Sequence, residues 1–248
     1  MVDRLFADAD LAALYDAMSP RRRRADFDFY MPLVMAAASV LDVGCGTGAL
    51  LHEARAAGHQ GRLVGLDPAA GMLAQARKRT DVEWVLGDLS SVGLDAAFDL
   101  VVMTGHAFQV LVEDAALRAA LAAVHRALTA SGRFAFETRN PPARAWEQWT
   151  DAHPFTFADA SGTKVQMVRQ VTSPFDGRTV SFSHTFTRAD WDQPRVSHST
   201  LRFLDASSLA SFLAEAGFVI EEQFGDWDRS PLANASPEII VIARARRT

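Results

Sequence analysis

Residues 40–50 read VLDVGCGTGAL, and this stretch decides the fold of the chain. An apolar run typical of a buried strand passes through Gly44, Gly46 and Gly48 directly into a helical pattern. Glycines in such a turn permit positive φ and let a ligand approach the backbone, and the helix that follows offers free N–H groups. The stretch therefore predicts a strand, a ligand-binding turn and a helix in succession.

The same alternation continues to about residue 139. Short apolar runs alternate with helical patterns, which is typical of a parallel sheet covered by helices. Gly58 ends the first helical pattern, and Pro68 begins the second. The third is expected to run from a cap at Asp114 to a turn at Ser131-Gly132. The apolar runs are SVLDV (39–43), RLVGL (62–66), VEWVL (82–86), FDLVVM (98–103) and RFAFET (133–138).

Residues 141–203, which we call the lid, follow a different pattern. Three segments alternate apolar and polar residues, which predicts an inserted antiparallel sheet with one apolar face. These segments are VQMVRQV (165–171), TVSFSHTFT (179–187) and RVSHSTLRF (195–203). The aromatic residues of the lid suit either a small, partly apolar acceptor or a dimer contact; they are Trp146, Trp149, Phe155, Phe157, Phe182 and Phe186.

The end of the chain returns to the first pattern. Asp205 is expected to cap a helix that Gly217 ends. Two strand-like runs follow, FVIEEQF (218–224) and EIIVIAR (238–244), and the loop between them bears prolines. This arrangement predicts a terminal antiparallel hairpin. Because no repeat and no linker divides the chain, we expect a single domain over residues 1–248.

Composition and charge exclude several classes of protein. A chain of 248 residues, 49% hydrophobic and 22% charged, is neither disordered nor collagen-like. The single Cys45 excludes an internal disulfide and a cysteine zinc cluster, and we expect no metal site. Without an export signal or an apolar span of roughly 20 residues, the sequence predicts a cytoplasmic protein with no membrane contact.

The glycine spacing by itself leaves the ligand open. Gly44-Cys-Gly46-Thr-Gly48-Ala49 fits the relaxed dinucleotide fingerprint, with Asp67 about 20 residues further on. However, Asp42 lies close to the turn, where a carboxylate would repel a pyrophosphate and suit a cationic ligand. Asp88 adds a third acid after the third run, at the sheet edge where open α/β folds bind ligands.

With the terminal hairpin, these residues resemble the class I S-adenosylmethionine-dependent methyltransferases, whose first motif VLDVGCGTG reproduces almost letter for letter. The resemblance covers residues 40–136 and 205–243. It implies an α/β, Rossmann-like, seven-stranded sheet with helices on both faces and strand order 3-2-1-4-5-7-6, the seventh strand antiparallel, plus the inserted lid. A lid in this position is similar to that of amino-sugar N,N-dimethyltransferases and glycine N-methyltransferase.

The resemblance also implies a site for S-adenosyl-L-methionine. The three glycines would pack against the methionine part while Asp42 orients the turn, and Asp67 would accept from the ribose hydroxyls. Asp88 and Leu89 would contact the adenine, and Met72 would either cover its other face or belong to the core. The residues implied are Asp42, Gly44, Gly46, Gly48, Asp67, Met72, Asp88, Leu89, Thr104 and Tyr15.

The N-terminal helical segment, residues 1–37, adds further candidates. Leu11, Leu14, Tyr15 and Met18 recur at helical spacing. By the resemblance this segment would fold over the cofactor, which makes Tyr15 and Tyr30 candidates for contact with cofactor or acceptor. A plain packed helix fits the same spacing.

His106 is the candidate for a catalytic base, since it follows the fourth run, where the acceptor approaches in the family, and a histidine can take a proton near pH 7. It could equally shape the pocket. His184 and His198 are weaker candidates. The function implied is methyl transfer from S-adenosylmethionine to the N or O of a small-molecule acceptor, by a monomer or a homodimer.

Three other functions stay open. An RNA methyltransferase could use a local basic patch, for which Arg21–Arg24 and the tail ARARRT are candidates in a chain of net charge −5. An isolated arginine run is more typical of a solvated loop, and the NPPY-type signature is absent after the fourth run, where Thr104, Gly105 and His106 stand. A non-catalytic adenosylmethionine-binding module and an NAD-dependent oxidoreductase are the remaining alternatives.

Overall fold

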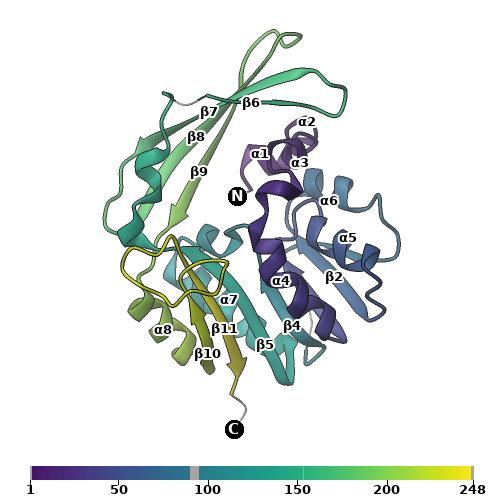
Figure 1. Ribbon diagram of the computed structural model, residues 1–248, viewed down its shortest axis with the longest axis vertical. Helices are drawn as coiled ribbons and strands as arrows, with labels where there is room; N and C mark the ends of the chain where they lie inside the picture. Colours follow the sequence, from purple (N-terminus) through teal and green to yellow (C-terminus); the bar gives the residue numbers. More distant parts are fainter. Residues whose placement is uncertain (1, 90–94, 153, 247–248) are drawn as a thin grey trace.

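The larger sheet of the protein has seven strands in the order β10-β11-β5-β4-β1-β2-β3 (Figure 1). The structure is a computed structural model that describes residues 2–89, 95–152 and 154–246. β11 runs antiparallel to its neighbours β5 and β10, and the other neighbouring pairs are parallel. The predicted order 3-2-1-4-5-7-6 is therefore confirmed. The strands are β1 (Ser39–Val43), β2 (Arg62–Asp67), β3 (Glu83–Leu86), β4 (Phe98–Met103), β5 (Leu128–Arg139), β10 (Phe218–Phe224) and β11 (Glu238–Ala245).

Helices cover both faces of this sheet, as predicted. On one face, α7 and α8 contribute Leu121 and Leu213 to a core with Phe134 and Val241. On the other, α4 and α5 bury their own apolar side chains against β1, β2 and β4. These burials supply the main driving force for folding. The helices are α4 (Ala25–Ala36), α5 (Ala49–Ala56), α6 (Ala70–Ala76), α7 (Asp114–Ala127) and α8 (Ala206–Glu215).

Local signals for helix ends were partly right. Asp205 caps α8 by accepting from the Ser208 N–H, and Gly217 after it has positive φ. Asp114 was wrong as a cap, because Glu113 holds that position and the Asp114 carboxylate instead pairs with Arg202 at 2.6 Å.

The predicted turn at Ser131-Gly132 is replaced by an irregular part of β5, where the pairing with β4 shifts from Phe98–Leu128 to Leu100–Arg133. Both residues lie inside β5. A Cβ on Gly132 would come within 2.9 Å of the Phe98 carbonyl oxygen, so this glycine serves the close approach of two strands.

The lid is a four-stranded antiparallel sheet that lies beyond the carboxyl ends of the parallel strands (Figure 1). Three of its strands were predicted. The fourth, β6, is only four residues long and lies at the sheet edge. The lid strands are β6 (Phe155–Ala158), β7 (Lys164–Ser173), β8 (Thr179–Arg188) and β9 (Arg195–Arg202).

The N-terminal segment joins the lid to the core. The helix expected from the spacing of Leu11 to Met18 is broken into α2 (Ala9–Ala12) and α3 (Tyr15–Met18), which follow α1 (Arg4–Ala7). Leu11 and Leu14 turn toward the lid, where they pack with Val165 and Phe186, whereas Ala12 packs against Met72 of α6. The N-terminal segment therefore packs against the lid and against helix α6 of the core.

Candidate active site

The turn after β1 holds three glycines with different tasks. Gly44, Gly46 and Gly48 have φ of +73°, +56° and +75°. A Cβ on Gly44 would lie 2.8 Å from the Ala107 side chain, and one on Gly48 would collide with the ring of Trp84. A Cβ on Gly46 would meet nothing within 4 Å. Gly44 and Gly48 thus permit close packing, and Gly46 leaves its side of the turn open to a ligand.

Asp67, at the end of β2, fastens this turn. Its Oδ2 accepts from the Gly46 N–H at 2.8 Å, and its Oδ1 accepts from the Ala69 N–H at 2.8 Å. Burial raises the pKa of the Asp67 carboxyl, while these two hydrogen bonds lower it. Each carboxylate oxygen has a second lone pair, so Asp67 can still accept from a ligand hydroxyl.

Asp42 is the most exceptional carboxylate of the site. It is 1% exposed, and its Oδ1 is buried with no hydrogen-bond partner among the described residues. Burial raises the pKa of Asp42 to about 7, although the nearby Arg24 guanidinium lowers it. A buried orphan acceptor of this kind can be satisfied by a cationic or hydrogen-bond-donating ligand.

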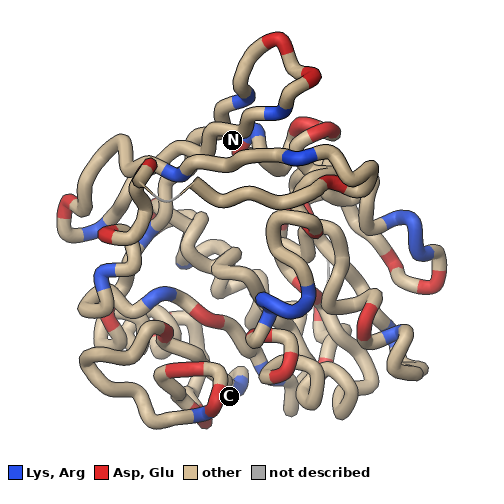
Figure 2. Tube along the Cα trace, turned by 45° about the horizontal axis from the view of Figure 1, so that its top comes forward, with Lys and Arg blue, Asp and Glu red and all other residues tan. Residues whose placement is uncertain are grey.

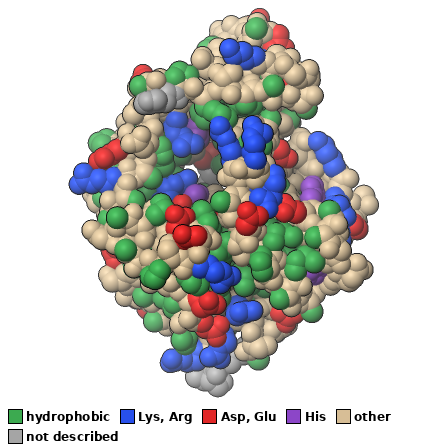
Figure 3. All heavy atoms as spheres, viewed as in Figure 1, with side chains coloured by type: hydrophobic (Ala, Val, Ile, Leu, Met, Phe, Trp, Pro, Cys, Tyr) green, Lys and Arg blue, Asp and Glu red, His purple; other side chains and the backbone are tan. Residues whose placement is uncertain are grey.

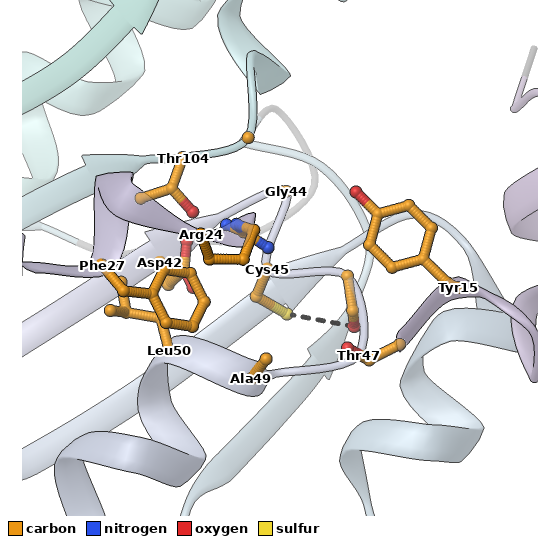
Figure 4. Close-up of a pocket in the computed structure, with 12 residues that line it drawn as sticks. Tyr15, Arg24, Phe27, Asp42, Gly44, Cys45, Thr47, Ala49, Leu50 and Thr104 are labelled. Atoms are coloured by element: carbon orange, nitrogen blue, oxygen red, sulfur yellow. Dashed lines mark hydrogen bonds between the residues drawn. The ribbon is translucent and has the colours of Figure 1, made fainter. Parts of the chain in front are cut away.

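Asp42, Gly44 and Gly46 line a cavity of about 320 Å³, open in part to solvent, at the carboxyl end of β1 (Figure 4), whereas Gly48 and Asp67 are not part of its wall. Of the residues implied by sequence, the cavity brings together Asp42, Gly44, Gly46, Thr104 and Tyr15. The sequence did not indicate the other residues of its wall, which are Arg24, Phe27, Cys45, Thr47, Ala49, Leu50 and Gly105.

The N-terminal segment closes one side of this cavity. Tyr15 and Arg24 both reach it from that segment (Figure 4), and Thr47 Oγ1 of the glycine turn donates to Asp16 at 2.6 Å. Arg24 is held by Asp26 at 2.7 Å and is mostly buried. The prediction that the arginine run is a solvated loop was therefore wrong for Arg24.

The adenine-contact candidates lie away from this wall. Met72 is buried with Ala12 and Ala69, as the core alternative would have it. Asp88 is exposed just after β3, and Leu89 is half-buried against the main core. Tyr30 is fully buried in α4, where its hydroxyl donates to Glu137 Oε2 at 2.5 Å.

His106 lies between Gly105 of the cavity wall and the short helix η2 (Ala107–Val110). Its backbone N–H donates to Glu137 Oε1 at 2.6 Å, and its ring Nε2 lies 2.9 Å from Glu238 Oε1. Glu137 and Glu238 come from β5 and from β11, so neither could be linked to His106 by sequence spacing. The topology of the sheet alone brings them together.

The His106–Glu238 contact has the distance of an ion pair, yet burial favours its uncharged form. Burial and the charge of Arg139 lower the pKa of His106 to about 3. Burial raises the pKa of Glu238 to about 7, against the opposing effect of Arg139. The imidazole is therefore neutral at pH 7, and a hydrogen bond between its Nε2 and Glu238 fixes the orientation of the ring.

The carboxyl-end geometry and the seven-stranded sheet agree with comparisons to known proteins. A family described as "Methyltransferase domain" matches residues 40–132. The resemblance to the class I S-adenosylmethionine-dependent methyltransferases is therefore confirmed over this domain. The cofactor of this methyltransferase domain is S-adenosylmethionine.

One curated relative is the 2-phytyl-1,4-naphtoquinone methyltransferase of Thermosynechococcus vestitus. It is 37% identical over 118 residues, which cover 45% of this chain and 51% of the relative. The chain spans about half the length of the first curated relatives it matches. The similarity to these relatives therefore covers only part of each protein.

Two solved structures extend the comparison to the lid. The CcbJ methyltransferase from Streptomyces caelestis has a TM-score of 0.77 and 20% identity over 96% of both chains. SAM-bound CalS10, an amino pentose methyltransferase from Micromonospora echinaspora, has a TM-score of 0.65 and 26% identity over 88% of both chains. The first comparison shows the shared fold.

Proposed function

We propose that this chain transfers a methyl group from S-adenosylmethionine to a nitrogen or oxygen atom of a small-molecule acceptor. The observation that supports it best is the position of the cavity, between the glycine turn of the methyltransferase domain and the N-terminal segment, at the carboxyl end of β1. Methyl transfer from a sulfonium is a one-step displacement, so the protein mainly has to align donor and acceptor and exclude water.

The residues of the cavity, and Asp67 behind its glycine turn, suit this cofactor. Gly46 leaves space at the turn, Asp42 offers an unpaired buried oxygen, and Asp67 keeps lone pairs for hydroxyl groups. In our proposal Asp67 holds the ribose and Asp42 orients the methionine end, with Tyr15 and Thr104 on the facing walls. When bound, the cofactor supplies the electrophilic methyl group.

The acceptor would enter from the side of the lid. His106 follows the cavity wall, and its neutral ring, held by Glu238, is fixed in orientation. We assign His106 to positioning of the acceptor, with proton removal as the competing role. The aromatic residues Trp149, Phe182 and Phe186 are buried in apolar clusters of the chain, which argues against a dimer contact for these three.

The RNA alternative is less well supported by the surface. Acidic and basic residues are interspersed along the chain (Figure 2). Within the run Arg21–Arg24, Arg21 pairs with Glu53 and Asp28, and Arg24 pairs with Asp26. Two of the four arginines are therefore already neutralised, which weakens a phosphate-binding patch.

An acceptor screen tests the proposal. The protein is incubated with methyl-labelled S-adenosylmethionine and panels of amines, amino sugars, phenols, carboxylic acids and transfer RNA. We expect labelled product from a small molecule and none from RNA. Labelling of RNA alone would support the nucleic-acid function, and saturable cofactor binding without any product across all panels would support the binding-module alternative.

We also propose the cytoplasm as the compartment, on the support of one unpaired, buried Cys45. Among the described residues, no helix combines the length and the apolar character that a membrane crossing requires. A monomer or a homodimer remains our proposal for the assembly.

A further inference from the structure

Arg169 lies in the middle of the inner face of the lid. In the register of β7 and β8 it is opposite His184, between the rows Met167–Phe186 and Val171–Phe182. Those two rows belong to separate apolar clusters. A half-buried cation thus lies between two apolar clusters on this face of the lid.

The contact with His184 fixes one edge of the Arg169 guanidinium. Arg169 Nε donates to His184 Nε2 at 2.9 Å. Because a guanidinium can only donate, Nε2 must be the acceptor and the imidazole is neutral. The two terminal amino groups of Arg169 have no hydrogen-bond partner among the described residues, and neither is closed off from solvent. The guanidinium of Arg169 is therefore fixed through Nε, and its two terminal amino groups can donate to a ligand.

No carboxylate of the described chain forms an ion pair with Arg169. Arg169 instead makes cation–π contacts with two aromatic rings. Its guanidinium carbon lies 5.3 Å from the ring centroid of Trp149 and 5.7 Å from that of Phe182. Burial and the charge of Arg139 lower the pKa of Arg169 to about 10. Cation–π attraction offsets only part of the cost of burying a charge.

Arg139 supplies a second cation at the same place. Its guanidinium carbon lies 5.4 Å from the centroid of the same Trp149 ring, and Nη1 donates to Gln109 at 2.8 Å. Unlike Arg169, it feels the charges of Glu137 and Glu238, which raise its pKa against the larger effect of burial. Arg169 is therefore the less compensated charge of the two.

This pair is continuous with the proposed donor site. Gly105 lines the cavity, His106 is the next residue, and the charge of Arg139 acts on the ring of His106. Figure 3 shows the molecule hollowed between the two sheets, with Lys or Arg and His side chains at the rim. A molecule in this hollow could contact Arg169 and approach His106 together.

We propose that Arg169, with Arg139 beside it, binds an oxyanion of the acceptor, either a carboxylate or a phosphoryl group. A planar fork with two free amino groups matches the two oxygens of such a group. The identity of the bound molecule as the methyl acceptor rests on the proposed function. The anion site itself rests only on the geometry of the lid.

The test is a thermal-shift titration with inorganic phosphate and, separately, benzoate, each compared with chloride at equal ionic strength. It is run with and without S-adenosylhomocysteine. We expect one or both anions to raise the Tm of the wild-type chain beyond the chloride reference. The stronger of the two assigns the oxyanion as phosphoryl or carboxylate.

Variants then locate the effect. Arg169→Gln should raise the half-saturating anion concentration by roughly tenfold to a hundredfold, the loss of hydrogen bonds to a charged group. Arg169→Lys keeps the charge but lacks the planar pair of amino groups. Its half-saturating anion concentration should lie between those of the wild type and Arg169→Gln. Arg188→Gln is the matched control, since Arg188 is on neighbouring β8 and pairs with Asp159 and Asp190. It should titrate as wild type.

A wild-type response equal to that in chloride, or an undiminished response in Arg169→Gln, would overturn the anion site. Calorimetric binding of S-adenosylmethionine to the same variants shows that they are folded. Failure of the wild type to bind the cofactor would contradict the proposed function, while the anion titration would still decide the site.

Discussion

The Gly46 N–H donates to the Asp67 carboxylate at 2.8 Å, and this bond ties the turn after β1 to the end of β2. The same carboxylate accepts from Ala69, just before α6. A single acid therefore links the glycine turn of the proposed cofactor site to the start of α6.

Replacement of Asp67 should weaken cofactor binding. Asp67→Ala removes the acceptor proposed for the ribose and also frees the Gly46 turn, so the binding free energy of S-adenosylmethionine should fall by roughly 1.5 to 3 kcal/mol. Isothermal calorimetry measures it. Asp99→Asn is the matched control, because Asp99 accepts from Ser39 at the opposite end of the sheet. An affinity unchanged in Asp67→Ala would remove this residue from the site.

Asp42 should make stability depend on pH. Its pKa is about 7 in the folded chain against an ordinary 3.8, so the native state holds the extra proton between these values. The free energy of unfolding therefore falls as the pH rises through that window.

Asp42→Asn removes this penalty. Its gain in the free energy of unfolding over wild type should grow between pH 4 and 7 and level off above, at roughly 4 kcal/mol at most. Denaturant unfolding at several pH values measures the difference. A difference that is constant with pH would show that Asp42 ionises normally.

His106→Ala should raise the acceptor KM more than it lowers kcat. Burial keeps the ring neutral, and Glu238 holds Nε2, which suits positioning of the acceptor. Steady-state kinetics with the acceptor found in the screen separates the two constants. His52→Ala is a control, since His52 lies in α5 and contacts the carbonyl of Ala76 at the end of α6. A loss of about a hundredfold or more in kcat, with the pH dependence abolished, would identify His106 as the base.

Leu11→Ala should loosen the lid. Leu11 is fully buried where the N-terminal segment meets the lid strands, so its truncation should cost roughly 2 to 5 kcal/mol. Hydrogen exchange should accelerate in residues 164–188, and the acceptor KM should rise. Leu121→Ala, in the core under α7, should destabilise the chain without this selective effect. Equal exchange in both variants would contradict a lid anchored by Leu11.

The sheet was predictable from sequence because its information is local. The motif at 40–50 and the alternation of apolar runs and helical patterns indicated a known family, and that resemblance implied the strand order. Single residues such as Gly58 and Asp205 marked helix ends correctly. Where a local signal served another purpose, prediction failed. Gly132 is needed for close strand packing, and Asp114 is needed for an ion pair.

The acceptor side was not predictable because its contacts join residues that are far apart in the sequence. His106 meets Glu238 across 132 positions of sequence, and Arg169 meets Arg139 only through a shared Trp149 ring. The alternation of β7 placed Arg169 on a face but said nothing of what that face covers. Arg24 was hidden within a run whose charge suggested a solvated loop, although Asp26 neutralises it inside the fold.

The central claim is that the glycine turn serves S-adenosylmethionine rather than a dinucleotide. Calorimetric titration of the purified chain with S-adenosylmethionine, S-adenosylhomocysteine, NAD and NADP tests it directly. We expect saturable binding of the first two at one site per chain and no heat of binding from NAD or NADP. Saturable binding of NAD without any adenosylmethionine signal would contradict the account.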